Sequence, residues 1–161
     1  MLRVERLTVD EAPRLRAIRL RALADAPDAF GTTFEQAAAQ PTEIWSEQLQ
    51  ELPTFVAVND GLDVGMVRCQ PDETEPDTAL LISMWVAPAS RRIGVGDALV
   101  DAAIEWARAN GVSRLQLYVV DDNAPAIALY ARKGFRATGV VVTLPPPREH
   151  IREHQRELRL R

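Results

Sequence analysis

The chain has 161 residues, of which 47% are apolar and 26% charged, and its net charge is −4. This length suits a single domain that buries a core, and this composition excludes an intrinsically disordered chain. The basic residues are scattered along the chain, so we expect no basic face for a nucleic acid. The only cysteine, Cys69, cannot form an internal disulfide, and a reducing cytoplasm is the expected compartment.

The longest apolar stretch, residues 79–87, contains Ser83 and is much shorter than a helix that spans a bilayer. The first six residues lack the apolar segment of a signal peptide. We therefore expect no membrane segment and no secretory leader, and we expect residues 1–161 to form one domain.

Apolar periodicity and turn residues predict the first half of the fold. In chain order they indicate a strand at residues 2–7, a helix that ends near Pro27, a loop followed by a helix around residues 44–49, and strands at 54–58 and 64–69. Thr8 and Glu11 form a capping box before the first helix. The turn at residues 59–61 (Asn-Asp-Gly) joins the last two strands as a hairpin.

The second half alternates strands and helices. It contains an acidic loop at residues 71–77, an apolar strand at 80–86, a helix at 96–110, a strand at 115–119, a short helix between Asn123 and Gly134, and strands at 140–144 and 156–160. The nearly all-apolar strand is typical of a central strand buried on both faces. The order of elements predicts an α/β (α+β) domain with a mixed sheet and helices on its faces.

The turn after the apolar strand has the features of a phosphate site. Residues 91–96 read RRIGVG and lead from a strand into a helix, whose first amides have no partner within the helix. Gly94 and Gly96 leave room for a ligand beside these amides, and Arg91 and Arg92 add positive charge. The alternative is a glycine-bearing turn with no ligand. A Rossmann fingerprint would need glycine or alanine at Leu99, and a P-loop would need a lysine in the turn.

Two segments resemble the GNAT superfamily of N-acetyltransferases. Residues 91–96 match the pattern Q/R-x-x-G-x-G/A, and residues 84–88 (MWVAP) are similar to the strand that precedes it in that family. Residues 123–135 (NAPAIALYARKGF) are similar to the family segment N-x-x-A-x-x-L-Y-x-x-x-G-F. The resemblance is strong over residues 80–135 and implies a splayed, mostly antiparallel sheet of about seven strands with helices on both faces.

The resemblance also implies a cosubstrate, acetyl-CoA, and its contacts. These are expected at Met84, Val86, Arg91, Arg92, Ile93, Gly94, Val95, Gly96 and Asn123. The backbone N–H near Val86 would polarise the thioester carbonyl. Asn123 would bond the pantetheine arm or help to place Tyr130, although it can also be a plain helix N-cap.

Tyr130 is the expected general acid, because a phenol with a pKa of about 10 keeps its proton at neutral pH and can donate it to a thiolate. The alternative for Tyr130 is a core aromatic residue. No general base stands out, since Tyr118 occupies the position at which peptide-acetylating relatives often carry a glutamate. The candidates are Glu35, Glu73, Glu75, Asp77, His150 and His154, and no metal site is expected.

The function implied is acetyl transfer from acetyl-CoA to a primary amine by direct attack, with a small-molecule acceptor favoured. The alternatives are a protein or peptide acetyltransferase, and a CoA-binding sensor without catalysis. Acceptor selectivity is expected from loops at residues 28–40, 71–77 and 145–150, whose acidity favours a cationic acceptor. A homodimer is a further expectation, through the strands that follow residues 145–147.

Overall fold

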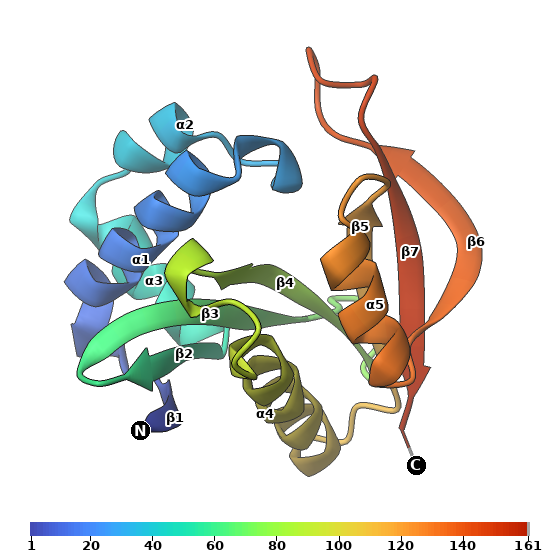
Figure 1. The fold of residues 1–161 in the computed structure, drawn as a ribbon, viewed down its shortest axis with the longest axis horizontal. Helices are drawn as coiled ribbons and strands as arrows, with labels where there is room; N and C mark the ends of the chain where they lie inside the picture. Colours follow the sequence, from blue (N-terminus) through green and yellow to red (C-terminus); the bar gives the residue numbers. More distant parts are fainter. Residues whose placement is uncertain (161) are drawn as a thin grey trace.

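The computed structural model describes residues 1–160 and contains one seven-stranded sheet (Figure 1). The strands are β1 (Leu2–Arg6), β2 (Thr54–Asn59), β3 (Leu62–Pro71), β4 (Thr78–Val86), β5 (Arg114–Val120), β6 (Arg136–Thr143) and β7 (Arg152–Arg159). Their order is β1-β2-β3-β4-β5-β7-β6, and all neighbours are antiparallel except β4 and β5, which are parallel. The mixed, mostly antiparallel sheet expected from the sequence is confirmed.

Helices cover both faces of this sheet. They are α1 (Ala12–Asp25), α2 (Phe34–Ala38), α3 (Thr42–Glu51), α4 (Val95–Ala109) and α5 (Ala124–Arg132). One buried cluster joins α1 and α3 to the sheet through residues such as Leu15, Trp45 and Met66. The other joins α4 and α5 to the opposite face, with Leu99 and Leu117 among its members. Figure 1 shows α1–α3 beside β1–β4, and α5 beside β5–β7.

Strand β4 carries a bulge at Ser83. Met66 of β3 pairs with Trp85, whereas Arg68 pairs with Ile82, so β4 has one extra residue between the two pairs. The extra residue is accommodated at Ser83, whose φ of 58° is a left-handed conformation that is uncommon outside glycine. Because a one-residue slip exchanges the two faces of a strand, the bulge changes the direction of every later side chain.

The faces of β4 show this exchange. Before the bulge, Ala79 and Leu81 face the core beneath α4; after it, Met84 and Val86 do so, while Trp85 joins the core beneath α1. The bulge therefore directs two apolar side chains at the carboxyl end of β4 toward α4 and α5.

Strands β4 and β5 pair over three residues only. Thr78–Leu80 of one pair with 114–116 of the other, and from there on the strands separate (Figure 1). The sheet is splayed at the strand that ends in Val86, as the sequence resemblance implied.

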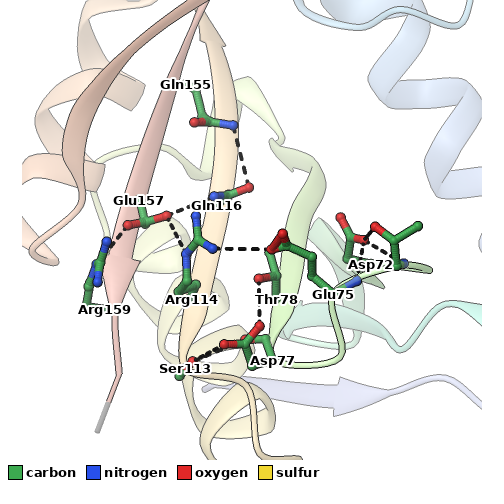
Figure 2. Close-up of polar contacts among 11 residues, drawn as sticks. Asp72, Glu75, Asp77, Thr78, Ser113, Arg114, Gln116, Gln155, Glu157 and Arg159 are labelled. Atoms are coloured by element: carbon green, nitrogen blue, oxygen red, sulfur yellow. Dashed lines mark hydrogen bonds and ion pairs between the residues drawn. The ribbon is translucent and has the colours of Figure 1, made fainter.

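Polar contacts close the paired end of the two strands (Figure 2). Arg114 donates to Glu157 at 3.1 Å and to Glu75 at 3.3 Å, and Gln116 donates to Glu157 at 2.8 Å. Asp77 accepts from Ser113 at 3.1 Å. The loop that joins β3 to β4 is thus tied to β5, and carboxylates of this acidic loop serve the fold.

Three element boundaries differ from expectation. Helix α2 lies in a segment expected to be a loop, where Thr33 and Gln36 form a capping box. Strands β6 and β7 each begin four residues before their expected starts, so that His154 lies in a strand. Residues 152–157 are charged or polar on both faces, so they carry none of the apolar alternation by which a strand is recognised.

Glu157 provides a test of the closed end. Hydrogen bonds from Gln116, and also from Arg114 and Arg159, lower the pKa of the Glu157 carboxyl against the opposing effect of burial. A carboxyl whose pKa is lower in the folded than in the unfolded chain stabilises the fold. Its full contribution is present at pH values above the pKa of the unfolded chain. That contribution is lost as the pH falls through the pKa of the folded chain.

We expect Glu157→Gln to lower the free energy of unfolding by about 1.5–3 kcal/mol at pH 7, because hydrogen bonds to a charged group are lost. The difference from wild type should shrink below about pH 4, where the wild-type carboxyl is itself protonated. Urea unfolding at several pH values measures both quantities. Glu105→Gln, an exposed change on α4, is the control. A constant difference between pH 3 and pH 7 would contradict the account.

Candidate active site

A cleft of about 1200 Å³ lies where β4 and β5 separate. Its walls come from residues 26–30 after α1, the end of β4, the turn before α4, the end of β5, helix α5, and residues 150–152 at the start of β7. The cleft therefore joins segments from both arms of the splayed sheet.

The structure brings the expected site residues together, with one exception. The residues that line the cleft include Met84, Val86, Arg91, Arg92, Gly94, Val95, Gly96, Asn123 and Tyr130. Ile93 is outside this lining, and its side chain is 55% exposed.

The backbone before α4 presents a run of free donors. Ala98 is the first residue of the helix whose amide has a backbone acceptor, the Gly94 carbonyl at 3.0 Å. Among the hydrogen bonds of residues 1–160, none is donated by the amides of residues 92–97 to a loop, turn or side-chain acceptor. The positive end of the α4 dipole coincides with these amides, so the turn suits a pyrophosphate.

The two glycines of the turn have different roles. Gly94 has a φ of +90°, and a Cβ there would meet nothing within 4 Å, so glycine is required by the backbone conformation. A Cβ on Gly96 would lie 3.0 Å from a methyl group of Leu129. Gly96 therefore permits the close approach of α4 to α5, a reason that differs from the ligand access expected from the sequence.

Arg91 is held by protein groups. Its Nε donates to the Val86 carbonyl at 3.0 Å and its second terminal nitrogen to Asp25 at 2.9 Å. The same carboxylate oxygen of Asp25 accepts from Trp85 Nε1 at 3.0 Å. Asp25 thus connects the end of α1 with β4 and with the turn. Arg91 fixes the shape of the turn, in addition to any charge that it offers a phosphate.

Sequence reasoning missed Asp25, although its position carries a signal. A carboxylate in the last turn of a helix opposes the helix dipole, which suggests that it has a partner elsewhere. It also missed Arg132 of α5, which lines the cleft and pairs with Asp97 at 3.2 Å. Arg132 falls on an x position of the family segment at residues 123–135, so the motif gave no reason to single it out.

The end of β4 directs a backbone donor into the splay. Successive residues of a strand point their N–H and C=O groups to opposite edges. The Ala87 amide donates to Val64 of β3 at 2.8 Å, so the Val86 N–H points to the other edge, where β5 has separated. This geometry suits the polarisation of a carbonyl in the cleft.

Tyr130 lies on α5 with its ring 5% exposed, against Phe135 in an edge-to-face contact at 5.8 Å. Burial raises the pKa of the Tyr130 phenol above its ordinary value, so the group is protonated at neutral pH. Within residues 1–160 its hydroxyl has no hydrogen-bond partner. Asn123 caps α5 by accepting from the Ala126 amide at 3.3 Å, which is the N-cap role.

The structure separates the candidates for the general base. Glu73, Glu75 and Asp77 belong to the loop at the start of β4, whereas the cleft lies at its end, and Glu35 is outside the cleft lining. His154 lies on β7 and contacts Asp121. Of the six candidates, His150 is the one that lines the cleft.

Residues 1–160 show neither of two features that would point to another kind of site. No cluster of three or more His, Cys, Asp or Glu side chains that could hold a metal occurs within residues 1–160. No helix in the same range combines the length and apolarity needed to cross a membrane.

The comparison with protein families identifies the class. The model of the acetyltransferase (GNAT) family matches residues 12–135, and the chain belongs to this family. A mycothiol acetyltransferase from Brachybacterium faecium is 34% identical over 134 residues, which are 80% of this chain and 38% of that protein. Another from Beutenbergia cavernae is 31% identical over 139 residues, 77% of this chain and 41% of that protein. The chain thus spans less than half the length of these relatives.

Solved structures share the fold. A GNAT acetyltransferase from Streptococcus pneumoniae has a TM-score of 0.83 at 22% identity, with 99% of this chain and 100% of that chain covered. A protein from Salmonella typhimurium, described as an acetyltransferase and solved with its cofactor acetyl-CoA, has a TM-score of 0.79 at 20% identity, with 100% and 95% covered.

Asp25 gives a prediction for the turn. We expect Asp25→Asn to weaken acetyl-CoA binding about 10-fold, since it removes the charged partner that holds Arg91. Removal of a negative charge beside an anionic ligand would by itself strengthen binding. A loss of acetyl-CoA affinity would therefore show that Asp25 acts by holding Arg91 in position. Isothermal titration measures the affinity. Asp28→Asn, an exposed carboxylate of the same cleft, is the control; equal affinities of the two variants would refute this role.

Proposed function

We propose that this chain transfers the acetyl group of acetyl-CoA to a primary amine, with a small molecule as the acceptor. The observation that supports this most is one cleft in which free backbone donors at a helix N-terminus lie beside a buried, protonated tyrosine. The first feature suits a pyrophosphate and the second suits an acid for a leaving thiolate.

Residues of both arms would hold the cosubstrate. The amides of residues 92–97 would bind the pyrophosphate, with Arg92 and Arg132 adding charge and Arg91 fixing the turn. Met84 and Val86 would contact the pantetheine arm and the acetyl group from the β4 side. Asn123 would position α5, and through it Tyr130, by capping the helix.

The chemistry would be a direct acyl transfer. The neutral amine attacks the thioester carbonyl, whose oxygen takes up negative charge toward the Val86 N–H. The carbon–sulfur bond breaks, and the thiolate takes the Tyr130 proton. The apolar surroundings that raise the tyrosine pKa also raise the pKa of the departing thiol, so the stronger base offsets the weaker acid. Before the attack, the ammonium form of the amine loses one proton to His150 or through water to solvent. After the attack, the nitrogen loses a second proton, which water carries to the Tyr130 phenolate.

No covalent enzyme intermediate is required. Cys69 is buried on β3, burial raises the pKa of its thiol to about 12, and the residue is outside the cleft lining. A thiol with that pKa supplies almost no thiolate at neutral pH.

Two functions are alternatives to small-molecule acetylation. A protein or peptide acceptor would fit the same cosubstrate site, and a CoA-binding sensor would keep the cleft without turnover. A screen of small amines, peptides and unfolded protein with detection of free thiol separates all three. The cytoplasmic location stays a prediction. Homodimerisation also stays a prediction, but its expected surface is corrected. The strand that follows residues 145–147 is β7, which lies between β5 and β6, so the free edge belongs to β6, with Val140, Val141 and Val142 exposed.

Binding of acetyl-CoA should be visible as a stabilisation of the folded chain. Acetyl-CoA at about 100 times its dissociation constant should stabilise the fold by about 2.7 kcal/mol, and NAD or ATP should do much less. Gly94→Val should abolish this shift and leave the far-UV spectrum intact. Gly139→Val is the matched control, because Gly139 has a similar φ of +92° in open space on β6. Thermal melts that respond to NAD and not to CoA would refute the assignment.

Tyr130 gives the second prediction. Tyr130→Phe should lower kcat by roughly 10²- to 10⁴-fold, the usual contribution of a general acid. It should change acetyl-CoA affinity little, because the proton is transferred only in the transition state. The control is Tyr118→Phe, which removes a hydroxyl that accepts from Gln155 at 3.0 Å on β7. Full turnover in Tyr130→Phe would remove the residue from the mechanism.

A further inference from the structure

Two arginines are buried beside the cleft without a carboxylate partner. Arg19 of α1 is 6% exposed and Arg68 of β3 is 7% exposed. No ion pair within residues 1–160 includes either of them. The chain supplies carboxylates elsewhere: Arg14, on the same helix as Arg19, is held by Asp63 at 2.8 Å, with two glutamates at 3.0 Å. Arg19 and Arg68 are the two fully buried arginines of residues 1–160, and both lack such a partner.

The hydrogen bonds of the pair are incomplete. Arg68 donates to Ser83 at 2.9 Å and to Gln48 at 2.7 Å, both neutral acceptors. Arg19 stacks on the ring of Phe30, with its guanidinium 4.7 Å from the ring centre, and its buried NH1 atom has no acceptor. Trp45 of α3, a member of the same core, also has a buried indole N–H without an acceptor.

Burial of these charges is unfavourable. It lowers the pKa of the Arg19 guanidinium to about 10 and that of Arg68 to about 9, and the charge of Arg19 lowers the Arg68 value further. Donors and charges that are buried without partners destabilise a fold, and a bound anion would supply the missing acceptor and counter-charge.

The pair borders the cleft on the side of α1. Phe30, which covers Arg19, lines the cleft. Ser83, which accepts from Arg68, directly precedes Met84, another lining residue. Val86, where the thioester would lie, is three positions after Ser83 on the strand, a distance of roughly 10 Å. Neither arginine lines the cleft itself, so the Phe30 ring has to move aside for a ligand to reach Arg19.

We infer that Arg19 and Arg68 bind an oxyanion of the acceptor, a carboxylate or a phosphate, so that the substrate is a small amine with an anionic group within roughly 10 Å of its nitrogen. The inference rests on the proposed function for the amine, but the anion site can be measured without turnover. It replaces the cationic acceptor expected from the acidic loops. Carboxylates of the loop at residues 71–77 bind Arg114 and Ser113 at the other end of β4.

The first experiment measures the anion site alone. With CoA present at saturation to occupy the amides of residues 92–97, inorganic phosphate and succinate, titrated against chloride at equal ionic strength, should raise the melting temperature of wild type to saturation. Arg19→Met should abolish this effect and raise the melting temperature of the free protein, since an uncompensated buried charge is removed. Arg16→Met, an exposed change on the same helix, should respond as wild type. Equal responses of wild type and Arg19→Met, or no saturable response of wild type, would overturn the inference.

The second experiment compares matched acceptors. The ratio of kcat/KM for 6-aminohexanoate over 6-aminohexanamide tests a carboxylate, and the ratio for phosphoethanolamine over ethanolamine tests a phosphate. At least one ratio should be well above one in wild type and fall by about 10- to 100-fold in Arg19→Met, because charge-assisted hydrogen bonds are lost. Ratios near one in wild type, or ratios that persist in Arg19→Met, would overturn the inference. If no amine is acetylated, the proposed function fails, and the melting experiment still decides the anion site.

Discussion

Strands β4 and β5 can pair over three residues only, and the site depends on their separation. Both strands are parallel and start side by side, where Arg114 and Glu157 help to hold the closed end. Beyond this point β4 packs with α1 and α4, whereas β5 continues as a pair with β7. The opening between them exposes a strand edge inside the molecule, with backbone donors that water or a ligand must satisfy.

The bulge at Ser83 makes this opening useful for chemistry. Without the extra residue, Met84 and Val86 would face α1, and Trp85 would face the cleft wall of α4. Ser83 also accepts from Arg68, so the residue that redirects β4 is in contact with the buried arginines. The cosubstrate side and the proposed acceptor side of the cleft are thereby set by one local feature of the backbone.

Contacts at the turn before α4 help to fix the two walls of the cleft to each other. Asp25 connects α1 to Trp85 and Arg91, and Gly96 allows α4 to approach Leu129 of α5. Arg132 adds an ion pair from α5 to Asp97. These contacts lie at the turn that presents the free amides, so a change in any of them alters the shape of the turn before it alters the core.

The sequence was sufficient to predict the parts of the fold and site that depend on local pattern. The turn at residues 91–96 and the segment at 123–135 indicate the proposed cosubstrate side, because helix starts and tight turns require particular residues at fixed spacing. The sequence did not reveal the partners of Asp25, the role of Gly96 or the position of Arg19 beside Phe30. Each of these depends on a contact between segments far apart in the chain, and each residue is unremarkable within its own helix or turn.

The central claim is that the amides before α4 bind the phosphates of acetyl-CoA within this cleft. Backbone amide NMR during a titration with acetyl-CoA tests it most directly, since a new acceptor on an N–H shifts its proton resonance. The account predicts that the largest changes occur at residues 92–97, with Gly94 and Gly96 moving downfield, and that changes at Tyr118 are small. Unchanged resonances at residues 92–97, with the main shifts in the smaller hollow around Asp72 and Tyr118, would contradict it.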